Sequence, residues 1–378
     1  MGVAAYIPGA ARSLLRPVVH GVREAALLPD LIRFQRGGGH GAVFLPSTGP
    51  AGAALLRIYT MAEALRPLGW RTLVLPPSLT LVQRLRVLKI ARPDVIVMQG
   101  ARHRLNRPGL YPGHRIVYDM DDADFHLDHL AEPVRRAMGE VDLVIAGSRY
   151  IANWARENGA GRTKVVWTGT PMSDRPVPSQ ASRSSVVVWA QTRPMNYKRE
   201  ADLVRRVMQK VAARVPGVTL RLYDRLPHDP AEFAKSFRAA GLRVEWQKQA
   251  LYKDFLTSLE DAAVGLAPLC PETPFSRGKS FGKVLAYLDR GVPVVGSDAC
   301  EHGAFFDTDS GVITNNEAAW VTAIARLLED APRRAALAGC ARSAFGRRLT
   351  AGAAAARLDR ALRCGVVDTR QGARVAGG

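Results

Sequence analysis

The fold is decided by residues 275–297, which read FSRGKSFGKVLAYLDRGVPVVGS. A basic, glycine-containing loop leads into a short helical pattern, then a tight turn at Gly291 and a continuous apolar run. Such a run is typical of a parallel strand buried on both faces. Backbone amides and cations ahead of a helix attract an anion, so we expect phosphate to bind at the start of this helix. The candidate residues are Arg277, Gly278, Lys279, Ser280 and Lys283.

Alternating strand and helix patterns extend in both directions from this stretch. Before a segment rich in proline and serine, apolar runs occur at 42–46, 72–75, 95–98, 116–118 and 143–146. After that segment, further runs follow at 186–189, 219–223, 244–246, 264–267 and 292–295. The alternation predicts an α/β protein with two doubly wound, parallel-sheet, Rossmann-like domains that face a cleft. A chain of 378 residues is also longer than one hydrophobic core usually supports.

These patterns divide the chain into five parts. We expect a basic amphipathic N-terminal arm (1–38), a first domain (39–170), a linker (171–185), a second domain (186–345), and a C-terminal helix with a flexible tail (346–378). The last helical pattern runs without interruption from 332 to 360.

The composition restricts the partners and the compartment. The formal net charge of +19 favours phosphate-bearing substrates or an anionic membrane surface, although a solvated basic surface would give the same excess. We find no nucleic-acid-binding module and therefore expect no nucleic-acid partner. Four cysteines without a Cys-x-x-Cys pair fit a reducing cytoplasm. Neither a signal peptide nor a membrane-spanning apolar run is evident.

The N-terminal arm is the part of the chain that could meet a membrane. Between residues 10 and 36, leucine, isoleucine and valine recur at near-helical spacing, with arginines between them. Pro17 and Pro29 divide the stretch into short helices. Such a segment can lie in a membrane interface or pack on the protein body, and the sequence leaves both open. We expect a cytoplasmic protein, with peripheral binding to the inner face of the cell membrane as one alternative.

The opening stretch resembles the nucleotide-sugar loop of family 4 glycosyltransferases with the GT-B fold. In that family, a Lys-Ser-x-x-Lys-x-x-Glu-Tyr pattern leads into Gly-x-Pro-Val-Val. The matching positions are Lys279, Ser280, Lys283, Tyr287, Gly291, Pro293, Val294 and Val295. Ala286 stands where the family has a glutamate that binds the ribose hydroxyls, and Asp289, one helical turn further on, could substitute for it.

The resemblance implies transfer of a sugar from a nucleotide diphosphate donor to a glycan or lipid-linked acceptor at the cytoplasmic membrane face. It also implies that the first domain binds the acceptor and the second binds the donor. Relatives in the family usually retain the anomeric configuration and usually need no bound metal. We therefore expect no cofactor, since the nucleotide sugar is itself a substrate.

Two further loops fit this interpretation. Arg193 and Lys198 follow the strand at 186–189, where a fork and a point charge can hold a diphosphate. In the family, an arginine and a lysine near this place contact the donor diphosphate, so both residues are candidate catalytic groups. Gly49 and Gly52 follow the first strand, where the family has a glycine-rich loop near the diphosphate. The alternative for Arg193 and Lys198 is a pair of solvated loop cations, and the alternative for Gly49 and Gly52 is a turn that is rich in glycine for packing alone.

Carboxylates cluster after the strand at 116–118, in the run Asp119-Met120-Asp121-Asp122-Ala123-Asp124. They could bind Mg²⁺, or act as nucleophile and general acid in a phosphatase of the haloacid-dehalogenase type. Under the glycosyltransferase interpretation no metal site is expected. Asp119 is then a candidate catalytic residue, and Asp121 a candidate ligand of an acceptor or sugar hydroxyl. A charged helix cap is the structural alternative, and a non-catalytic GT-B scaffold that binds a membrane or a partner is another function to consider.

Overall fold

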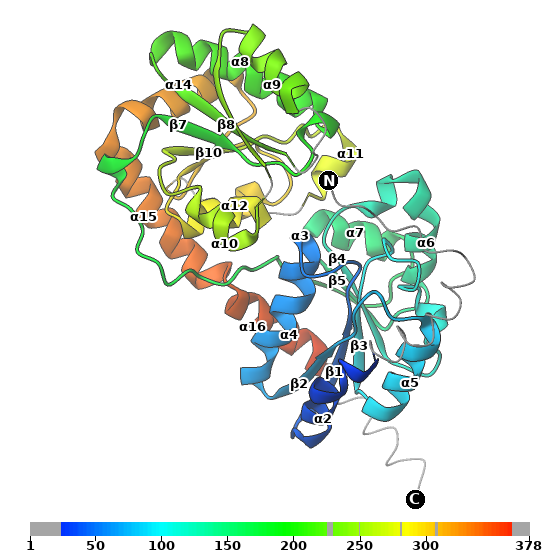
Figure 1. The fold of residues 1–378 in the computed structure, drawn as a ribbon. Helices are drawn as coiled ribbons and strands as arrows, with labels where there is room; N and C mark the ends of the chain where they lie inside the picture. The colour runs from blue at the N-terminus through cyan, green and yellow to red at the C-terminus, as the bar shows by residue number, and fades with distance from the viewer. Residues whose placement is uncertain (1–23, 225–229, 249, 280–281, 307–308, 365–378) are drawn as a thin grey trace, which may run out of the picture.

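The computed structural model describes residues 24–364 except 225–229, 249, 280–281 and 307–308, and contains two parallel sheets (Figure 1). The six-stranded sheets have the orders β2-β1-β3-β4-β5-β6 and β12-β11-β10-β7-β8-β9. The first comprises β1 (His40–Leu45), β2 (Trp70–Val74), β3 (Val95–Gln99), β4 (Ile116–Met120), β5 (Leu143–Ala146) and β6 (Thr163–Val165). The second comprises β7 (Val186–Trp189), β8 (Thr219–Asp224), β9 (Arg243–Lys248), β10 (Val264–Ala267), β11 (Val294–Gly296) and β12 (Val312–Ile313). The predicted α/β fold with two doubly wound sheets is confirmed.

Helices flank both sheets. The first domain carries α2 (Leu28–Arg36), α3 (Gly52–Ala54), α4 (Thr60–Leu65), α5 (Leu81–Ala91), α6 (Asp128–Met138) and α7 (Arg149–Glu157). The second carries α8 (Lys198–Arg214), α9 (Pro230–Ala239), α10 (Tyr252–Thr257), α11 (Pro274–Arg277), α12 (Gly282–Asp289), α13 (His302–Phe305), α14 (Glu317–Glu329) and α15 (Ala331–Arg348). A final helix, α16 (Ala351–Arg363), packs on α4 of the first domain. Within the described residues, no helix is long and apolar enough to cross a lipid bilayer.

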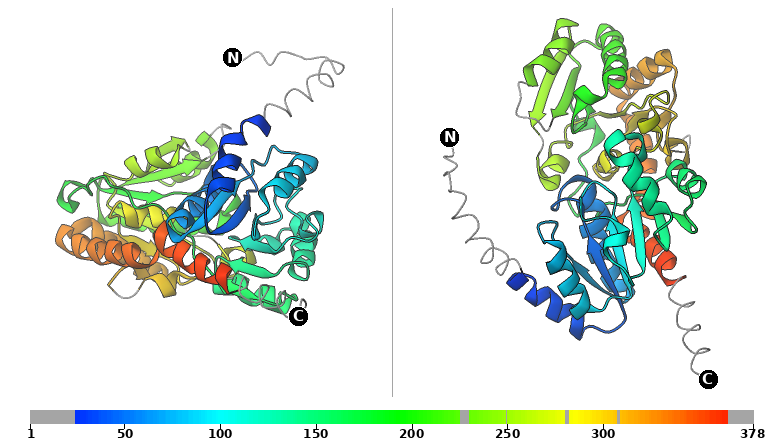
Figure 2. Two further views of the ribbon diagram at one scale, coloured as in Figure 1. Left: turned by 90° about the horizontal axis from the view of Figure 1, so that it is seen from below. Right: turned by 90° about the vertical axis from the view of Figure 1, so that its right-hand side faces the viewer.

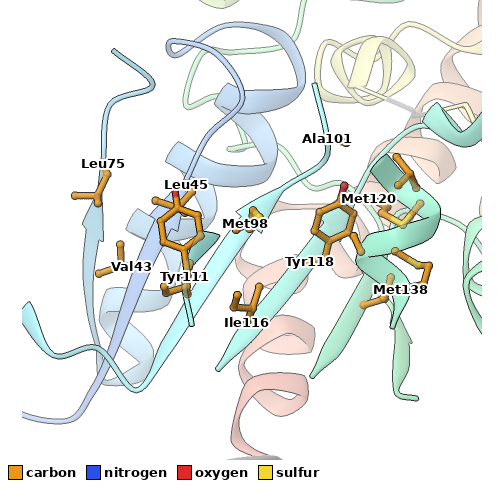
Figure 3. Packing of buried hydrophobic residues seen from close by; sticks show 14 of the residues in the cluster. Val43, Leu45, Leu75, Met98, Ala101, Tyr111, Ile116, Tyr118, Met120 and Met138 are labelled. Carbon is orange, nitrogen blue, oxygen red and sulfur yellow. The ribbon is translucent and has the colours of Figure 1, made fainter. Parts of the chain in front are cut away.

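The strands of the first sheet bury both of their faces. On β1, Val43 and Leu45 belong to one apolar cluster, whereas Ala42 and Phe44 belong to another. Figure 3 shows part of the first cluster, in which Val43 and Leu45 lie on the same side of the sheet as Met98. Strands buried on both faces read as continuous apolar runs, which is why they could be predicted from the sequence. The two strands that were not predicted, β6 and β12, are short and partly exposed.

The chain returns to the first domain through α15 and α16 (Figure 1). The prediction of one uninterrupted helix over residues 332–360 is wrong, because α15 ends at Arg348 and α16 begins at Ala351. The helix breaks where it meets the outgoing chain. Thr170 N donates to Leu349 O at 3.2 Å, and Ala351 N donates to Thr170 O at 2.8 Å. Thr350 then caps α16 through its side chain.

The segment that leaves the first domain and the segment that returns to it are in contact at Gly169. A Cβ on Gly169 would lie 2.4 Å from the backbone oxygen of Thr350, so no other residue fits there without a shift. After the crossing, α16 lies against the first domain (Figure 2) and contributes Ala355, Leu358 and Leu362 to its core. The two domains are therefore joined by two adjacent segments of chain.

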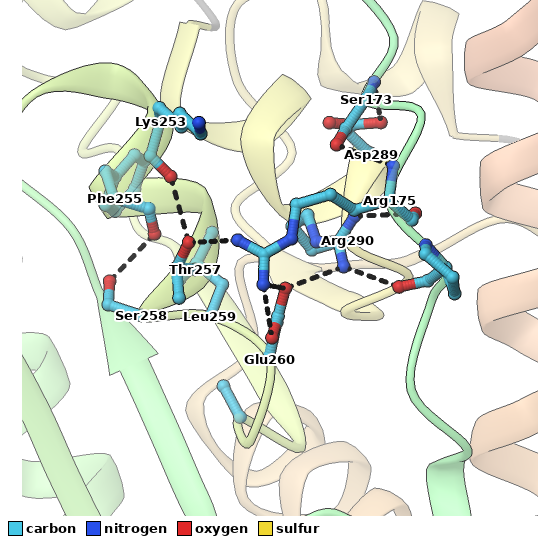
Figure 4. Close-up of polar contacts among 12 residues, drawn as sticks. Ser173, Arg175, Lys253, Phe255, Thr257, Ser258, Leu259, Glu260, Asp289 and Arg290 are labelled. Atoms are coloured by element: carbon cyan, nitrogen blue, oxygen red, sulfur yellow. Dashed lines mark hydrogen bonds and ion pairs between the residues drawn. The ribbon is translucent and has the colours of Figure 1, made fainter.

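The linker is fastened to the second domain (Figure 4). Arg290 donates to the backbone oxygen of Pro176 at 2.8 Å and pairs with Glu260 at 3.0 Å. Asp289 accepts a hydrogen bond from Ser173 N at 3.0 Å and pairs with Arg342 of α15. Asp289 is fully buried against the linker and α15. Asp289 is therefore not free to bind a ribose, and the role suggested for it from the sequence is not supported.

Candidate functional site between the domains

The acidic loop of the first domain meets the basic loop of the second between the two sheets. The loops after β1 and β4 lie at the carboxyl edge of one sheet, and the loop after β7 and the start of α12 lie at the other, which is where doubly wound sheets bind ligands (Figure 1). Lys279 Nζ lies 3.9 Å from Asp122 Oδ1 across this space. Beside this pair, Gly278 is buried against the first domain, since a Cβ there would lie 2.7 Å from the Cβ of Ala123.

Asp119, at the end of β4, is held by a buried arginine. Arg57 Nε donates to Asp119 Oδ2 at 3.1 Å, and its Nη2 donates to Oδ1. Arg57 comes from the π-helical turn Leu55–Tyr59, a kind of turn that is frequent at functional sites. Burial opposes the charge of Arg57, but the carboxylates of Asp119 and Asp121 outweigh it and raise the pKa of the guanidinium. Both oxygens of Asp119 are thus engaged within the protein.

Asp121 lines a pocket beside Asp119 and has one buried carboxylate oxygen without a partner among the described residues. Its Oδ1 accepts a hydrogen bond from Thr168 Oγ1 at 2.6 Å, whereas its buried Oδ2 has no hydrogen-bond partner among the described residues. Burial raises the pKa of Asp121 to about 6, and Asp122 adds to this against the opposing charge of Arg57. The pocket it lines is also bounded by Ser47, Ala53, Gln99, Gly100, Arg102, Asp119 and Asp122.

The other two carboxylates of the loop are clamped by one arginine. Arg102 Nη2 donates to Asp122 Oδ2 at 2.9 Å, and Arg102 Nε donates to Asp124 Oδ2 at 2.8 Å. Two guanidinium groups, those of Arg57 and Arg102, therefore organise the acidic run. Within the described residues, no group of three His, Cys, Asp or Glu side chains is arranged to hold a metal ion. An Asp119 nucleophile would also need an oxygen that Arg57 now occupies, so the geometry disfavours the phosphatase alternative.

Two lysines stand at and just before the start of α12. Lys279 Nζ lies 5.2 Å from the ring centre of Tyr197. Burial opposes its charge, but Asp122 and Tyr197 together outweigh burial and raise the pKa of Lys279. Burial lowers the pKa of Lys283 to about 8, and the charge of Lys279 adds to this effect. Among the described residues no carboxylate lies within ion-pair distance of Lys283. Lys279 and Lys283 together therefore carry positive charge that the protein does not fully neutralise.

The remaining predicted cations lie on the loops around these lysines. Arg193 occupies the position before the short helical turn that follows β7, and Lys198 begins α8. Tyr197 lies between them in the chain and beside Lys279. Both cationic side chains are exposed. Arg277 is exposed as well and donates to the backbone oxygen of Pro271 at 2.9 Å. Ser280 lies outside the described residues.

The loop after β1 forms the opposite wall of the pocket. Ser47 donates to Gln99 Oε1 at 2.9 Å through both its backbone nitrogen and its hydroxyl, which ties the loop to β3. Gly52 has a φ of +52°, and nothing lies within 4 Å of a Cβ built at Gly52 or at Gly49. The left-handed backbone favours glycine at position 52, and both glycines border open space.

The position that resembles the ribose-binding glutamate is part of the core. Ala286 is fully buried in the middle of α12. The next residue, Tyr287, accepts a hydrogen bond from Ala190 N at 2.8 Å and fixes the helix against β7. Neither Ala286 nor Asp289 offers a carboxylate to a nucleotide.

Several residues of the site were not predicted from the sequence. Arg57 is an arginine within the apolar pattern Leu55-Leu56-Arg57-Ile58, a break in amphipathicity that could have been noticed. Arg149 Nε pairs with Glu301 Oε2 at 3.1 Å across the domains. No local sequence pattern could have paired these two residues, because they are 152 positions apart in the chain.

Comparisons with known proteins identify the fold. No protein-family model and no curated protein matches the chain. Sucrose-phosphate synthase from Thermosynechococcus elongatus is 15% identical, with a TM-score of 0.65 over 86% of this chain and 98% of that one. Anabaena HepE, solved in complex with UDP-glucose, is 18% identical, with a TM-score of 0.65 over 86% of this chain and 99% of that one. AviGT4, a glycosyltransferase involved in avilamycin A biosynthesis, is 15% identical, with a TM-score of 0.59 over 87% and 98%.

These similarities cover nearly the whole length of the neighbouring chains. At such low identity they establish architecture, and the two-domain GT-B fold expected from the sequence is confirmed.

Proposed function

We propose that the chain is a glycosyltransferase that moves a sugar from a nucleotide diphosphate donor to a hydroxyl group of a glycan or lipid-linked acceptor. The observation that carries the proposal is the pairing of opposite chemistries across the cleft. Lys283 and Lys279 leave positive charge for a diphosphate, and Asp121 leaves a carboxylate oxygen for a hydroxyl. Neighbours of the same fold that bind or use sugar nucleotides, such as HepE with UDP-glucose, support this proposal.

In the proposed reaction, the bond between sugar C1 and a diphosphate oxygen breaks, and a bond between C1 and the acceptor oxygen forms. The electron pair of the broken bond stays on the diphosphate, where Arg193, Lys198, Lys279 and Lys283 would stabilise it. Gly49 and Gly52 would let the backbone approach the phosphates. Retention follows if the acceptor attacks from the face that the diphosphate leaves, with its proton passing to a diphosphate oxygen.

The acidic loop would hold the hydroxyl groups in this scheme. Asp121 Oδ2 accepts a hydrogen bond from a sugar or acceptor hydroxyl, and the Arg57–Asp119 pair positions the loop that carries it. Four side-chain cations neutralise the negative charge of the leaving diphosphate in place of a metal, so the scheme requires no metal or other cofactor. Transfer that persists in EDTA is the expected result.

We further propose that the protein works in the cytoplasm at the inner face of a membrane. The net charge of +19 suits an anionic lipid surface, and a lipid-linked acceptor would be presented there. A non-catalytic scaffold is the second candidate, because Ala286 removes the carboxylate that binds ribose in the family that the sequence resembles.

Donor binding tests the proposal directly. The melting temperature of the protein would be measured in EDTA with UDP-, GDP-, ADP- and dTDP-sugars. A sugar nucleotide that binds adds about 2.7 kcal/mol to the free energy of unfolding at one hundred times its dissociation constant. Lys283→Ala should weaken the binding of the active donor about tenfold or more, since a charge-assisted hydrogen bond contributes roughly 1.5–3 kcal/mol. Lys235→Ala, an exposed lysine on α9, is the matched control and should bind like the wild type.

The possible outcomes separate the candidates. If no sugar nucleotide raises the melting temperature, the scaffold is favoured and the proposed activity is wrong. If a donor binds the wild type and Lys283→Ala equally well, the donor site has been assigned to the wrong residues. Proton NMR of the first-formed product then tests retention through the anomeric configuration.

A further inference from the structure

Helices α2 and α5 form a continuous outer surface on the first domain. The side chain of Gln35 on α2 donates to the backbone oxygen of Ile90 on α5, and Arg86 on α5 pairs with Glu24, just before α2, at 2.9 Å. Figure 1 shows both helices at the end of the first domain away from the second. We call the outward side of these two helices the α2–α5 face. Its apolar residues are Leu28, Ile32, Val82, Leu85 and Ile90, and its basic residues are Arg33, Arg36, Arg86, Lys89 and Arg92.

The apolar residues of this face are not needed for the core. Each helix already buries an inner stripe, exemplified by Leu31 and Phe34 on α2 and by Val87 and Leu88 on α5. Nine large apolar side chains are exposed in the described part of the chain, and five of them belong to the α2–α5 face. Val82 is 65% exposed. A concentration of exposed apolar side chains in one place marks an interaction surface, whereas scattered ones do not.

The charges of the face define the partner. Among the described residues no carboxylate pairs with Arg36, Lys89 or Arg92. The sequence of residues 1–23, which leads into α2, contains three arginines and no acidic residue. The face therefore combines apolar side chains with an uncompensated positive charge, which is the chemistry that anionic lipid headgroups and acyl chains complement. A second copy of the same face would bring like charges together.

We propose that the α2–α5 face docks onto an anionic lipid bilayer. The apolar side chains insert at the level of the headgroups and acyl chains, and the basic side chains contact the lipid phosphates. The inference rests on the membrane location proposed above and names the surface responsible. The proposed donor site lies between the domains, away from the α2–α5 face. Loss of membrane binding and loss of donor binding can therefore be measured separately.

Vesicle co-sedimentation of the full-length protein tests the proposal. Vesicles of phosphatidylcholine with phosphatidylglycerol should bind the protein, those of phosphatidylcholine alone should not, and high salt should weaken the binding. The double variant Ile32→Ser, Val82→Ser should bind about tenfold more weakly, because two side chains lose their apolar contact with the bilayer. Lys89→Glu should act in the same direction. Leu251→Ser, an exposed leucine of the second domain, is the matched control and should bind like the wild type.

Three outcomes would overturn the proposal. Absence of binding to anionic vesicles would do so, as would equal binding of the wild type and the double variant, which would assign docking to another part of the chain. A concentration-dependent dimer that the double variant abolishes would make the face a protein interface instead. Because the substituted side chains are exposed, circular dichroism should show that the variants fold like the wild type. The donor should also raise the melting temperature of the variants as much as that of the wild type.

Discussion

Arg57 and Asp119 form an ion pair that is almost completely enclosed, with 3% and 5% of their side chains exposed. The guanidinium also donates to Val166 O at 2.6 Å. One side chain thus ties the turn after α3 to β4 and to the chain leaving β6. The acidic loop begins at Asp119, so this pair determines where Asp121 lies.

Removal of the arginine tests this relationship. Arg57→Met should destabilise the fold by about 3–5 kcal/mol, because it leaves the Asp119 carboxylate buried without its partner. The free energy of unfolding in urea measures the loss. Arg205→Met is the matched control, since its pair with Asp202 is exposed and should contribute less than about 1 kcal/mol. Similar losses in the two variants would show that the Arg57 pair is no stronger than a surface pair.

The pH dependence of stability should report on Asp121. Burial raises its pKa from 3.8 to about 6, so between these pH values the folded protein holds a proton that the unfolded chain has released. The free energy of unfolding therefore falls as the pH rises through this window, by about 2 kcal/mol. Asp121→Asn should remove this part of the slope in urea unfolding at pH 4 to 7, whereas the exposed Asp202→Asn should keep it. An unchanged slope in Asp121→Asn would mean that the carboxyl ionises normally.

The strands could be predicted because burial on both faces makes them apolar. The bounds expected for β5, β7 and β10 agree with the structure. The sequence carries only a weak sign of the break between α15 and α16, the N-cap residue Thr350, since the stretch from 332 to 360 is rich in alanine and arginine and has no proline after the first residue. The break is caused by the pairing of Thr170 with Leu349 and Ala351, which is a tertiary effect.

The candidate site could be predicted only as far as its loops. The rule that ligands lie beyond the carboxyl ends of strands located the acidic run and the lysines. It did not assign partners, so the sequence could not show which of Asp119 and Asp121 keeps an oxygen without a partner. The structure separates them, because Arg57 engages both oxygens of Asp119 and leaves one oxygen of Asp121 without a partner among the described residues.

Donor affinity should depend on the protonation of Lys283. Its pKa is lowered to about 8, so the free protein loses this charge as the pH rises above that value. The affinity for the free nucleoside diphosphate should therefore fall above pH 8, by up to about tenfold per pH unit. Lys283→Arg keeps its charge and should remove the decline. Titration calorimetry from pH 7 to 10 distinguishes the two, and a wild-type affinity independent of pH would contradict the lowered pKa.

The contact at Gly278 should be required for turnover and not for donor binding. A Cβ at this position would lie 2.7 Å from the Cβ of Ala123 and 3.2 Å from Tyr150, so Gly278→Ala must move the loops of the two domains apart. Donor contacts on the second domain are retained, and we expect an affinity within about threefold of the wild type. The alignment of donor and acceptor is lost, and a displacement of about 1 Å can lower kcat roughly a hundredfold.

Gly346→Ala in α15 is the matched substitution for this test. Nothing lies within 4 Å of a Cβ there, so alanine should stabilise the helix by about 0.5–1 kcal/mol and leave kcat unchanged. Steady-state kinetics and calorimetry on both variants separate turnover from donor affinity. Wild-type turnover in Gly278→Ala would mean that the reaction does not need this close approach. A parallel loss of donor affinity would instead place Gly278 in the phosphate site itself.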